Sequence, residues 1–181
     1  MLLVVDNGSV YTSSLLECIK NLGADFEHHV FSEVSQTNLD NYSSIILSGR
    51  RKNDIQMNVI NSKLILHSLD KGKPLLGICY GAEILALTLG GTIKKMTSPR
   101  HGLHQVKTIT SNPLCNGKID AFESHSYMVS KLSSSFTQIA SSVDCKFEIF
   151  QYSSKNVFGT QFHPEMSVDG RSLLEKFSTI K

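Results

Sequence analysis

The sequence predicts an α/β protein of one domain, residues 1–181, with an open, mainly parallel sheet that is flanked by helices and carries a short antiparallel extension. In the first half, short apolar runs alternate with segments whose apolar residues recur at helical spacing, which is typical of βαβ units. In the second half, short strand-like runs follow one another with few helices between them. A chain of 181 residues with 40% hydrophobic side chains can bury a core of this kind.

Turn and helix signals divide the first half of the chain. The first apolar run ends at the turn-forming letters DNGS, and the helical pattern after it ends at Gly23, which suits a helix C-terminus. Strands are predicted at 2–5, 43–47 and 73–78, a weakly alternating segment at 26–31, and helices at 12–23, 57–69 and 82–89. Because helices separate the strands, the strands should run parallel.

The second half is predicted to form a series of short strands and one final helix. Strands are predicted at 92–96, 105–109, 121–123, 147–152 and 157–162, and an amphipathic helix at 171–177. The serine-rich stretch 130–136 is predicted to be a surface loop. No repeat or low-complexity tract interrupts the chain, which favours a single domain.

Composition argues against several classes of protein. A net charge of +2 gives no reason to expect a nucleic-acid or membrane partner, and no apolar run reaches the length of a membrane span. The apolar N-terminus meets Asp6 early and is predicted to be a strand rather than a signal peptide. The four cysteines lie far apart without a CxxC pair, which argues against a zinc site and a disulfide framework. We therefore expect a reduced, cytoplasmic protein.

The stretch LLGICYGAE, residues 75–83, places Cys79 between the end of a predicted strand and the start of a helix. Ligands of open parallel sheets bind at this end of the strands, and the helix N-terminus favours the thiolate. Gly77 and Gly81 allow the sharp turn of a G-x-nucleophile-x-G elbow, with cysteine in the place of serine. The alternative is a buried structural cysteine, which is the commoner fate of this residue.

A nucleophilic thiol needs a base, and one histidine stands in a suitable setting. VFGTQFHPE, residues 157–165, is a predicted strand that runs into His163, and Pro164 favours an extended conformation at that histidine. Side chains two apart on a strand share a face, so Glu165 should orient one ring nitrogen of His163 while the other faces Cys79. Alone, the pair could be a strand-end histidine with a solvated glutamate. Together the two motifs favour a catalytic triad.

At this point the motifs resemble a known family. LLGICYGAEILAL and GTQFHPE look like the class I, triad-type glutamine amidotransferases, and VVDNGSVYT, ILSG, SHSYMVSKL and DGRSLLEKF follow in the family's order over nearly the whole chain. The resemblance implies a flavodoxin-like arrangement of the sheet. Within the family, the chain most resembles the separate glutaminase subunit of archaeal-type GMP synthase.

The resemblance implies a mechanism and a partner. Cys79 would attack the side-chain amide of glutamine, His163 would transfer the proton, and Glu165 would hold the imidazole, so that ammonia and glutamate form through a γ-glutamyl thioester. This half-reaction needs no cofactor or metal. The ammonia would pass to a separate ATP-pyrophosphatase synthetase chain that uses ATP and Mg²⁺, with conversion of xanthosine monophosphate to GMP as the expected reaction.

The resemblance also implies the groups that hold the substrate. The oxyanion would accept from the backbone N–H of Tyr80 and from a donor at Gly49 or Arg50, after the letters ILSG. Backbone groups of Ser126 and Tyr127 are expected to contact glutamine.

Two positions depart from the family pattern, and both are expected at the glutamine site. Arg50, followed by Arg51, stands where the family usually has a second glycine, whose amide belongs to the oxyanion hole. Because arginine adopts positive φ only at a cost, the hole should form differently or only when a partner docks. The arginines could instead contact a partner or an anionic group, or be solvated loop charges. Glu83 replaces the glutamine of G-x-C-x-G-x-Q, where it can accept from the α-ammonium group of the substrate.

Three other functions stay open at this point. The histidine-serine pair before Tyr127 also resembles amidotransferase subunits of anthranilate and aminodeoxychorismate synthases. Arg50 and Glu83 leave room for a stand-alone hydrolase of another γ-glutamyl compound. A degenerate amidotransferase that binds and regulates a partner is the non-enzymatic alternative.

Overall fold

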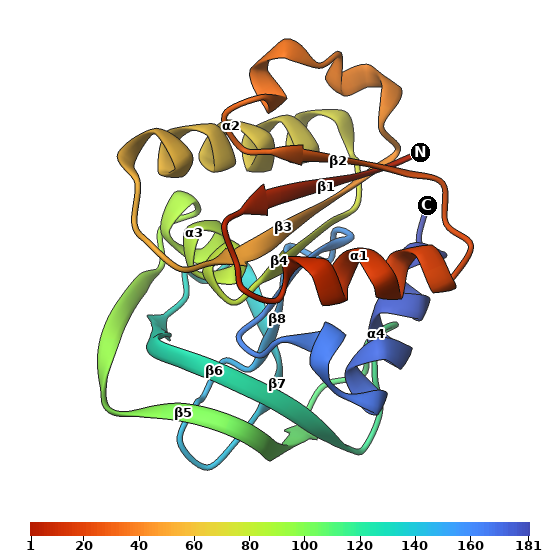
Figure 1. The fold of residues 1–181 in the computed structure, drawn as a ribbon. Coiled ribbons are helices and arrows are strands. Elements are labelled where there is room, and N and C mark those ends of the chain that lie inside the picture. The colour runs from red at the N-terminus through yellow and green to blue at the C-terminus, as the bar shows by residue number, and fades with distance from the viewer.

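The computed structural model describes all residues, 1–181, and contains one nine-stranded mixed sheet with helices on both faces (Figure 1). The strand order is β2-β1-β3-β4-β9-β8-β7-β5-β6. The strands are β1 (Leu2–Asn7), β2 (Phe26–Val30), β3 (Ser44–Arg50), β4 (Leu75–Ile78), β5 (Thr92–Thr108), β6 (Lys118–Lys131), β7 (Phe136–Ser141), β8 (Ile149–Tyr152) and β9 (Val157–Thr160). The α-helices are α1 (Thr12–Asn21), α2 (Ile55–Lys71), α3 (Tyr80–Thr88) and α4 (Val168–Ser178).

The five strands β2, β1, β3, β4 and β9 are parallel, as the alternation of strands and helices predicts. Side chains of β1 alternate between the two faces of this parallel half. Leu2 and Val4 pack with α1 and α4, whereas Leu3 and Val5 pack with α2 and α3. Because both faces are covered, these strands consist of nearly continuous apolar residues, and this is why the sequence reveals them.

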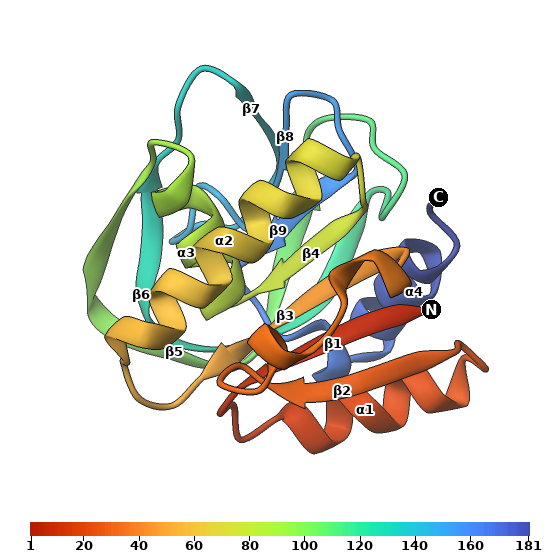
Figure 2. The ribbon, with the colours of Figure 1, turned by 90° about the horizontal axis from the view of Figure 1, so that it is seen from above.

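The antiparallel half comprises β8, β7, β5 and β6, and it differs from the sequence-based expectation in two ways. First, β5 and β6 are long strands that pair with each other along most of their length, not a set of short strands (Figure 2). Second, the sequence pattern does not predict β7. The middle of β5 is not predicted because its sequence, TSPRHG, is polar. A bulge interrupts the pairing with β6 between Lys95 and Arg100, and most side chains of β5 are exposed.

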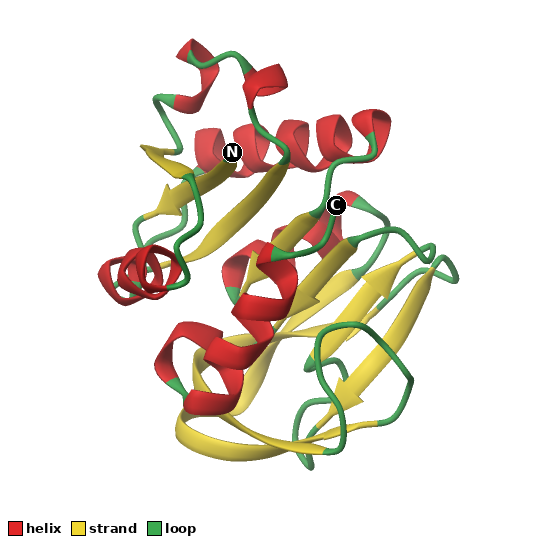
Figure 3. Cartoon of the chain, turned by 90° about the vertical axis from the view of Figure 1, so that its right-hand side faces the viewer, coloured by secondary structure: helices red, strands yellow, loops and turns green.

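The two halves also differ in how helices cover them. Figure 3, in which helices are red, shows most of the helical residues beside the parallel strands, although α4 also packs on β6, where the Asp120 N–H donates to Asp169. Loops that follow β1, β3 and β4 leave the same edge of the sheet, because parallel strands end together there. None of the helices is long and apolar enough to cross a membrane.

Candidate active site

The turn between β4 and α3 has a strained backbone at Cys79. This residue has φ 51° and ψ −102°, a conformation that a residue with a side chain rarely adopts. A Cβ atom at Gly77 would lie 2.4 Å from the carbonyl carbon and oxygen of Gly81, and one at Gly81 would lie 2.3 Å from the carbonyl oxygen of Leu47. The prediction that both glycines are needed for a tight nucleophile elbow is therefore confirmed.

The Cys79 thiol is buried, with 8% of the residue exposed. Burial raises its pKa well above the ordinary value, and the carboxylates of Glu83 and Glu165 raise it further. The backbone N–H of Tyr80 and the guanidinium of Arg50 lower this pKa, by less. The thiol is therefore protonated at neutral pH, and it can react only if a base removes its proton.

His163 and Glu165 form a hydrogen-bonded pair in which imidazole Nδ1 lies 2.8 Å from carboxylate Oε1. Both residues are buried, at 3% and 2% exposure. The ionised carboxylate accepts from Nδ1–H, which leaves Nε2 free to accept a proton. The contact is the predicted one, but its geometry is different: β9 ends at Thr160, and a short 3₁₀ turn, Pro164–Met166, brings Glu165 back to the ring.

The surroundings of the His163 ring include two residues with roles that the sequence does not suggest. A Cβ atom at Gly49 would lie 2.9 Å from His163 Cε1, so only glycine leaves room for the ring. The Tyr11 ring lies 4.6 Å from the imidazole between centroids, and its hydroxyl donates to Ser124 Oγ at 3.1 Å. Tyr11 follows β1 at the edge of the sheet where Cys79 lies, which is the signal that could have identified it.

A pocket of about 280 Å³ opens beside Cys79. Its wall brings together residues from three distant parts of the sequence: the segment after β3, the β4–α3 turn and the middle of β6. The predicted site residues on this wall are Arg50, Cys79, Tyr80, Glu83, Ser126 and Tyr127. The remaining three, Gly49, His163 and Glu165, do not line it.

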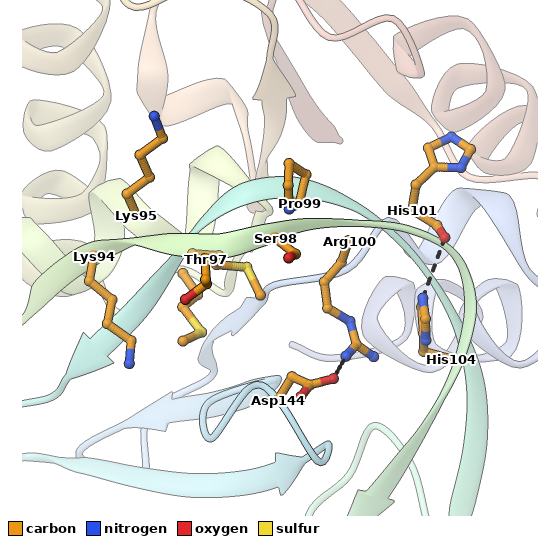
Figure 4. Close-up of a pocket in the computed structure, with 11 residues that line it drawn as sticks. Lys94, Lys95, Thr97, Ser98, Pro99, Arg100, His101, His104 and Asp144 are labelled. Carbon is orange, nitrogen blue, oxygen red and sulfur yellow. Dashed lines mark hydrogen bonds and ion pairs between the residues drawn. The ribbon is translucent and has the colours of Figure 1, made fainter.

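A larger cavity, about 450 Å³, lies under the β5–β6 pair and away from the thiol. Figure 4 shows Arg100 and His104 on β5 reaching into this region, with Arg100 bound to Asp144. The Arg100 charge is neutralised there, because its Nε also lies 2.8 Å from Glu123 Oε2. The cavity contains no thiol, and Cys79, His163 and Glu165 do not line it. The smaller pocket is therefore the candidate active site, although it has less volume.

The comparison with protein families agrees with this geometry. The family model described as glutamine amidotransferase class-I matches residues 3–179. The chain belongs to this family. Its relatives include the glutamine-hydrolysing GMP synthase subunit of Thermoplasma acidophilum, which is 31% identical over 96% of this chain and 89% of that protein. The glutamine-hydrolysing GMP synthase of Salmonella typhimurium is 29% identical over 97% of this chain, which spans only 36% of that relative.

Solved structures show the same fold. A crystal structure of a protein described as a GMP synthase subunit, also from Thermoplasma acidophilum, superposes with a TM-score of 0.86 and 28% identity, over 98% of this chain and 91% of that one. A glutamine amidotransferase from Thermotoga maritima has a TM-score of 0.76 at 20% identity, over 93% of this chain and 77% of that one. The family and the α/β fold that the motifs predict are thus confirmed.

The two departures from the family pattern lie together at the pocket of this amidotransferase. Arg50 is the last residue of β3, and its Nη2 lies 3.9 Å from Glu83 Oε2. Burial raises the pKa of the Glu83 carboxyl, while Arg50, the amide of Gln161 and His125 lower it. The side chains of Arg50 and Glu83 therefore both belong to the pocket, and neither of these two is simply a solvated surface charge.

A buried histidine holds the pocket wall that β6 contributes. His125 Nε2 lies 3.0 Å from Glu123 Oε2, and Nδ1 lies 2.8 Å from the carbonyl oxygen of Tyr127. The predicted strand at 121–123 ends before His125, whereas the structure has His125 within β6. The ring thus links the Glu123 carboxylate to the Tyr127 carbonyl and holds the backbone at Ser126 and Tyr127.

Proposed function

We propose that this chain is a glutaminase subunit that hydrolyses glutamine to glutamate and ammonia and supplies the ammonia to a separate ATP-dependent synthetase. The observation that carries the proposal is the strained thiol at the end of β4 in a chain that also holds a buried imidazole–carboxylate pair. The names of the relatives support GMP synthesis, with xanthosine monophosphate as the compound aminated by the synthetase.

In the proposed reaction, the Cys79 sulfur attacks the amide carbon of glutamine while His163 Nε2 takes the thiol proton. His163 returns this proton to the leaving nitrogen, the C–N bond breaks, and ammonia departs from a γ-glutamyl thioester. Water, deprotonated by the same imidazole, then attacks the thioester carbon, and glutamate leaves as the thiol is restored. Glu165 keeps the ring in the tautomer that both steps require.

An oxyanion forms in both steps and needs donors. The N–H of Tyr80 is the first of helix α3 and contacts the Cys79 sulfur, so it is suitably placed for one hydrogen bond. The second donor would come from the backbone at Gly49 or Arg50, at the end of β3. Ser126 and Tyr127 would contact glutamine through main-chain groups from the opposite wall of the pocket.

The glutaminase half-reaction is proposed to need neither a metal nor a cofactor, since acyl transfer to a thiol requires only proton transfer and oxyanion stabilisation. ATP and Mg²⁺ would bind the synthetase, with which this chain would form a heteromer. We expect both subunits in the cytoplasm, and no nucleic acid or membrane among their partners.

The test is glutamate release from glutamine by the purified chain, alone and with the synthetase, ATP and xanthosine monophosphate. Cys79→Ala should abolish release and leave the unfolding midpoint close to the wild-type value. Cys115→Ala is the matched control, because that thiol lies outside the pocket and should be dispensable for turnover. Turnover by Cys79→Ala would overturn the mechanism, and GMP formation that does not depend on glutamine would overturn the pairing with this synthetase.

Arg50 and Glu83 favour one further candidate, a stand-alone hydrolase of another γ-glutamyl compound. The charged pair at the pocket differs from the family pattern and could select a different leaving group. Faster turnover of γ-glutamyl amines than of glutamine, without a synthetase, would establish this alternative.

A further inference from the structure

Arg50 is held rigidly at the pocket by three neighbours on one side of its guanidinium. The group lies 4.2 Å from the centroid of the Tyr80 ring, and Nη1 donates to Asn53 Oδ1 at 2.6 Å and to Asn58 Oδ1 at 3.4 Å. Tyr80 donates to the same Asn58 oxygen at 2.8 Å, which fixes the ring under the guanidinium. Nη2 takes no part in these hydrogen bonds, and its charged partner is the Glu83 carboxylate, 3.9 Å away.

Glu83 is a buried carboxylate that has no hydrogen bond to a cationic side chain. The side chain is 7% exposed, and its Oε2 lies 3.9 Å from Arg50, which is too long for a hydrogen bond. The amide of Gln161 lies close enough to stabilise the ionised carboxylate, yet the fully buried Nε2 of Gln161 has no hydrogen-bond partner. Because Arg50 is too far away for a hydrogen bond, the Glu83 carboxylate can still accept from a cationic group of a ligand in the pocket.

We propose that Arg50 and Glu83 bind the two charges of the substrate's α-amino-acid end, with Glu83 accepting from the α-ammonium group and Arg50 Nη2 donating to the α-carboxylate. The inference rests on the proposed function and assigns the Arg50 side chain a role that its backbone position does not suggest. The long separation within the pair is consistent with this role, because a zwitterion placed between the two groups replaces a weak contact with two direct charge-assisted hydrogen bonds.

The arrangement also explains how one pocket keeps two opposite charges near a thiol. An unpaired Glu83 would disfavour the thiolate of Cys79, and Arg50 offsets that effect from the same wall. When the α-ammonium of the substrate neutralises Glu83, this repulsion falls further. Because the α-carboxylate of the same substrate neutralises Arg50, the zwitterion keeps the charges near the thiol balanced, whereas a compound without the ammonium group would leave Glu83 unpaired and disfavour the thiolate.

The experiment compares L-glutamine with two analogues that each lack one charge. Glutaramate keeps the carboxylate but has no α-ammonium, and 4-aminobutanamide keeps the ammonium but has no α-carboxylate. The readout is protection of Cys79 in the full chain against alkylation by iodoacetamide, which does not require turnover. Glutamine hydrolysis by the unsubstituted chain with its synthetase is measured separately.

Each variant should weaken only the ligands that carry its charge partner. Arg50→Gln should raise the protecting concentration of glutamine and glutaramate about tenfold or more and leave 4-aminobutanamide within about twofold. Glu83→Gln should show the opposite selectivity, weakening glutamine and 4-aminobutanamide. Lys52→Gln is the matched control, since Lys52 is exposed, carries the same charge as Arg50 and does not line the pocket; it should change none of the three values.

Two outcomes would overturn the inference. If both variants weaken the binding of all three ligands equally while their unfolding midpoints stay unchanged, the pair shapes the pocket but does not recognise the charges of the ligand. If neither variant changes protection, the pair does not contact the ligand. In both cases the proposed function still holds if the unsubstituted chain hydrolyses glutamine. If instead the ligands protect Cys79 with the predicted selectivity but glutamine is not hydrolysed, the proposed function is overturned, and the inference that Arg50 and Glu83 bind the ligand charges still holds.

Discussion

The two halves of the sheet are stabilised by different kinds of interior. The parallel half buries apolar side chains on both faces, with Leu3, Val4 and Leu47 fully inaccessible. The antiparallel half keeps a buried network of ionisable side chains, in which Glu123 and Glu148 have no exposed surface. Non-directional burial tolerates many sequences, whereas a buried charge needs its specific partners.

The two halves also supply different parts of the candidate active site. The parallel half supplies Cys79 and the room for the His163 ring, from a framework that is rigid because it is tightly packed. The antiparallel half supplies the pocket wall at Ser126 and Tyr127, which is held by His125 and the charges behind it. The position of the Cys79 thiol therefore depends on packing, and the wall depends on electrostatics.

Breaking the charged network should have the largest effect on stability. Arg100→Gln leaves Glu123 without its main counter-charge in a buried setting, and we expect the free energy of unfolding to fall by about 3–5 kcal/mol. Urea denaturation measures this change. Lys95→Gln, an exposed lysine on the same strand, should cost less than about 0.5 kcal/mol. A small loss for Arg100→Gln would mean that the antiparallel half does not depend on its charges.

Crowding the elbow in the parallel half should cost less stability and more activity. Gly81→Ala places a Cβ atom against the backbone oxygen of Leu47, and we expect a loss of about 1–3 kcal/mol. Displacement of the thiol should also reduce kcat by roughly 10²-fold. Gly72→Ala is the control: its Cβ meets nothing within 4 Å at φ 66°, so it should cost about 1 kcal/mol through backbone strain alone and leave kcat unchanged. Equal activity in the two variants would contradict this role for Gly81.

A third effect is a pH dependence that originates in the antiparallel half. Burial raises the pKa of Glu148 to about 8, and neighbouring Glu123 adds to the rise. The folded state therefore holds a proton that the unfolded chain releases above its ordinary pKa of about 4.3. The contribution of Glu148 to the free energy of unfolding is therefore fully present below the unfolded-state pKa of about 4.3. It is lost as the pH rises toward the folded-state pKa of about 8, at a rate of at most about 1.4 kcal/mol per pH unit.

Glu148→Gln should flatten the decline between pH 5 and pH 8, as measured by urea unfolding at several pH values. An unchanged decline in this variant would show that other groups cause the dependence.

Much of the parallel half is predictable from the sequence for one physical reason. Strands that are buried on both faces are apolar throughout, and helices with one buried face repeat at helical spacing. The predicted strand at 43–47 and helix at 57–69 accordingly correspond to β3 and α2, with ends that differ by a few residues. The elbow glycines are also predictable, because a turn this tight excludes side chains.

The antiparallel half is less predictable because its strands are half exposed. Gly102, Pro99 and the polar residues between them interrupt any regular pattern in β5, although hydrogen bonds to β6 maintain the strand. The contact of Tyr11 with His163 joins residues that lie far apart in the sequence, and no local pattern records such a contact.

The chemistry of this protein can be read from its amino-acid letters: a thiol after a buried strand, a histidine with a carboxylate two residues away, and two charged departures from the family pattern. Those features follow from local rules, because an elbow, an apolar strand and an i, i+2 pair each need only a few neighbouring residues. The folded chain was needed to show that Arg50 and Glu83 lie beside each other at one pocket, that Gly49 makes room for the imidazole, and that buried charges support the wall that β6 contributes. These contacts join segments that meet only when the sheet forms, and so the packing of the whole chain decides them.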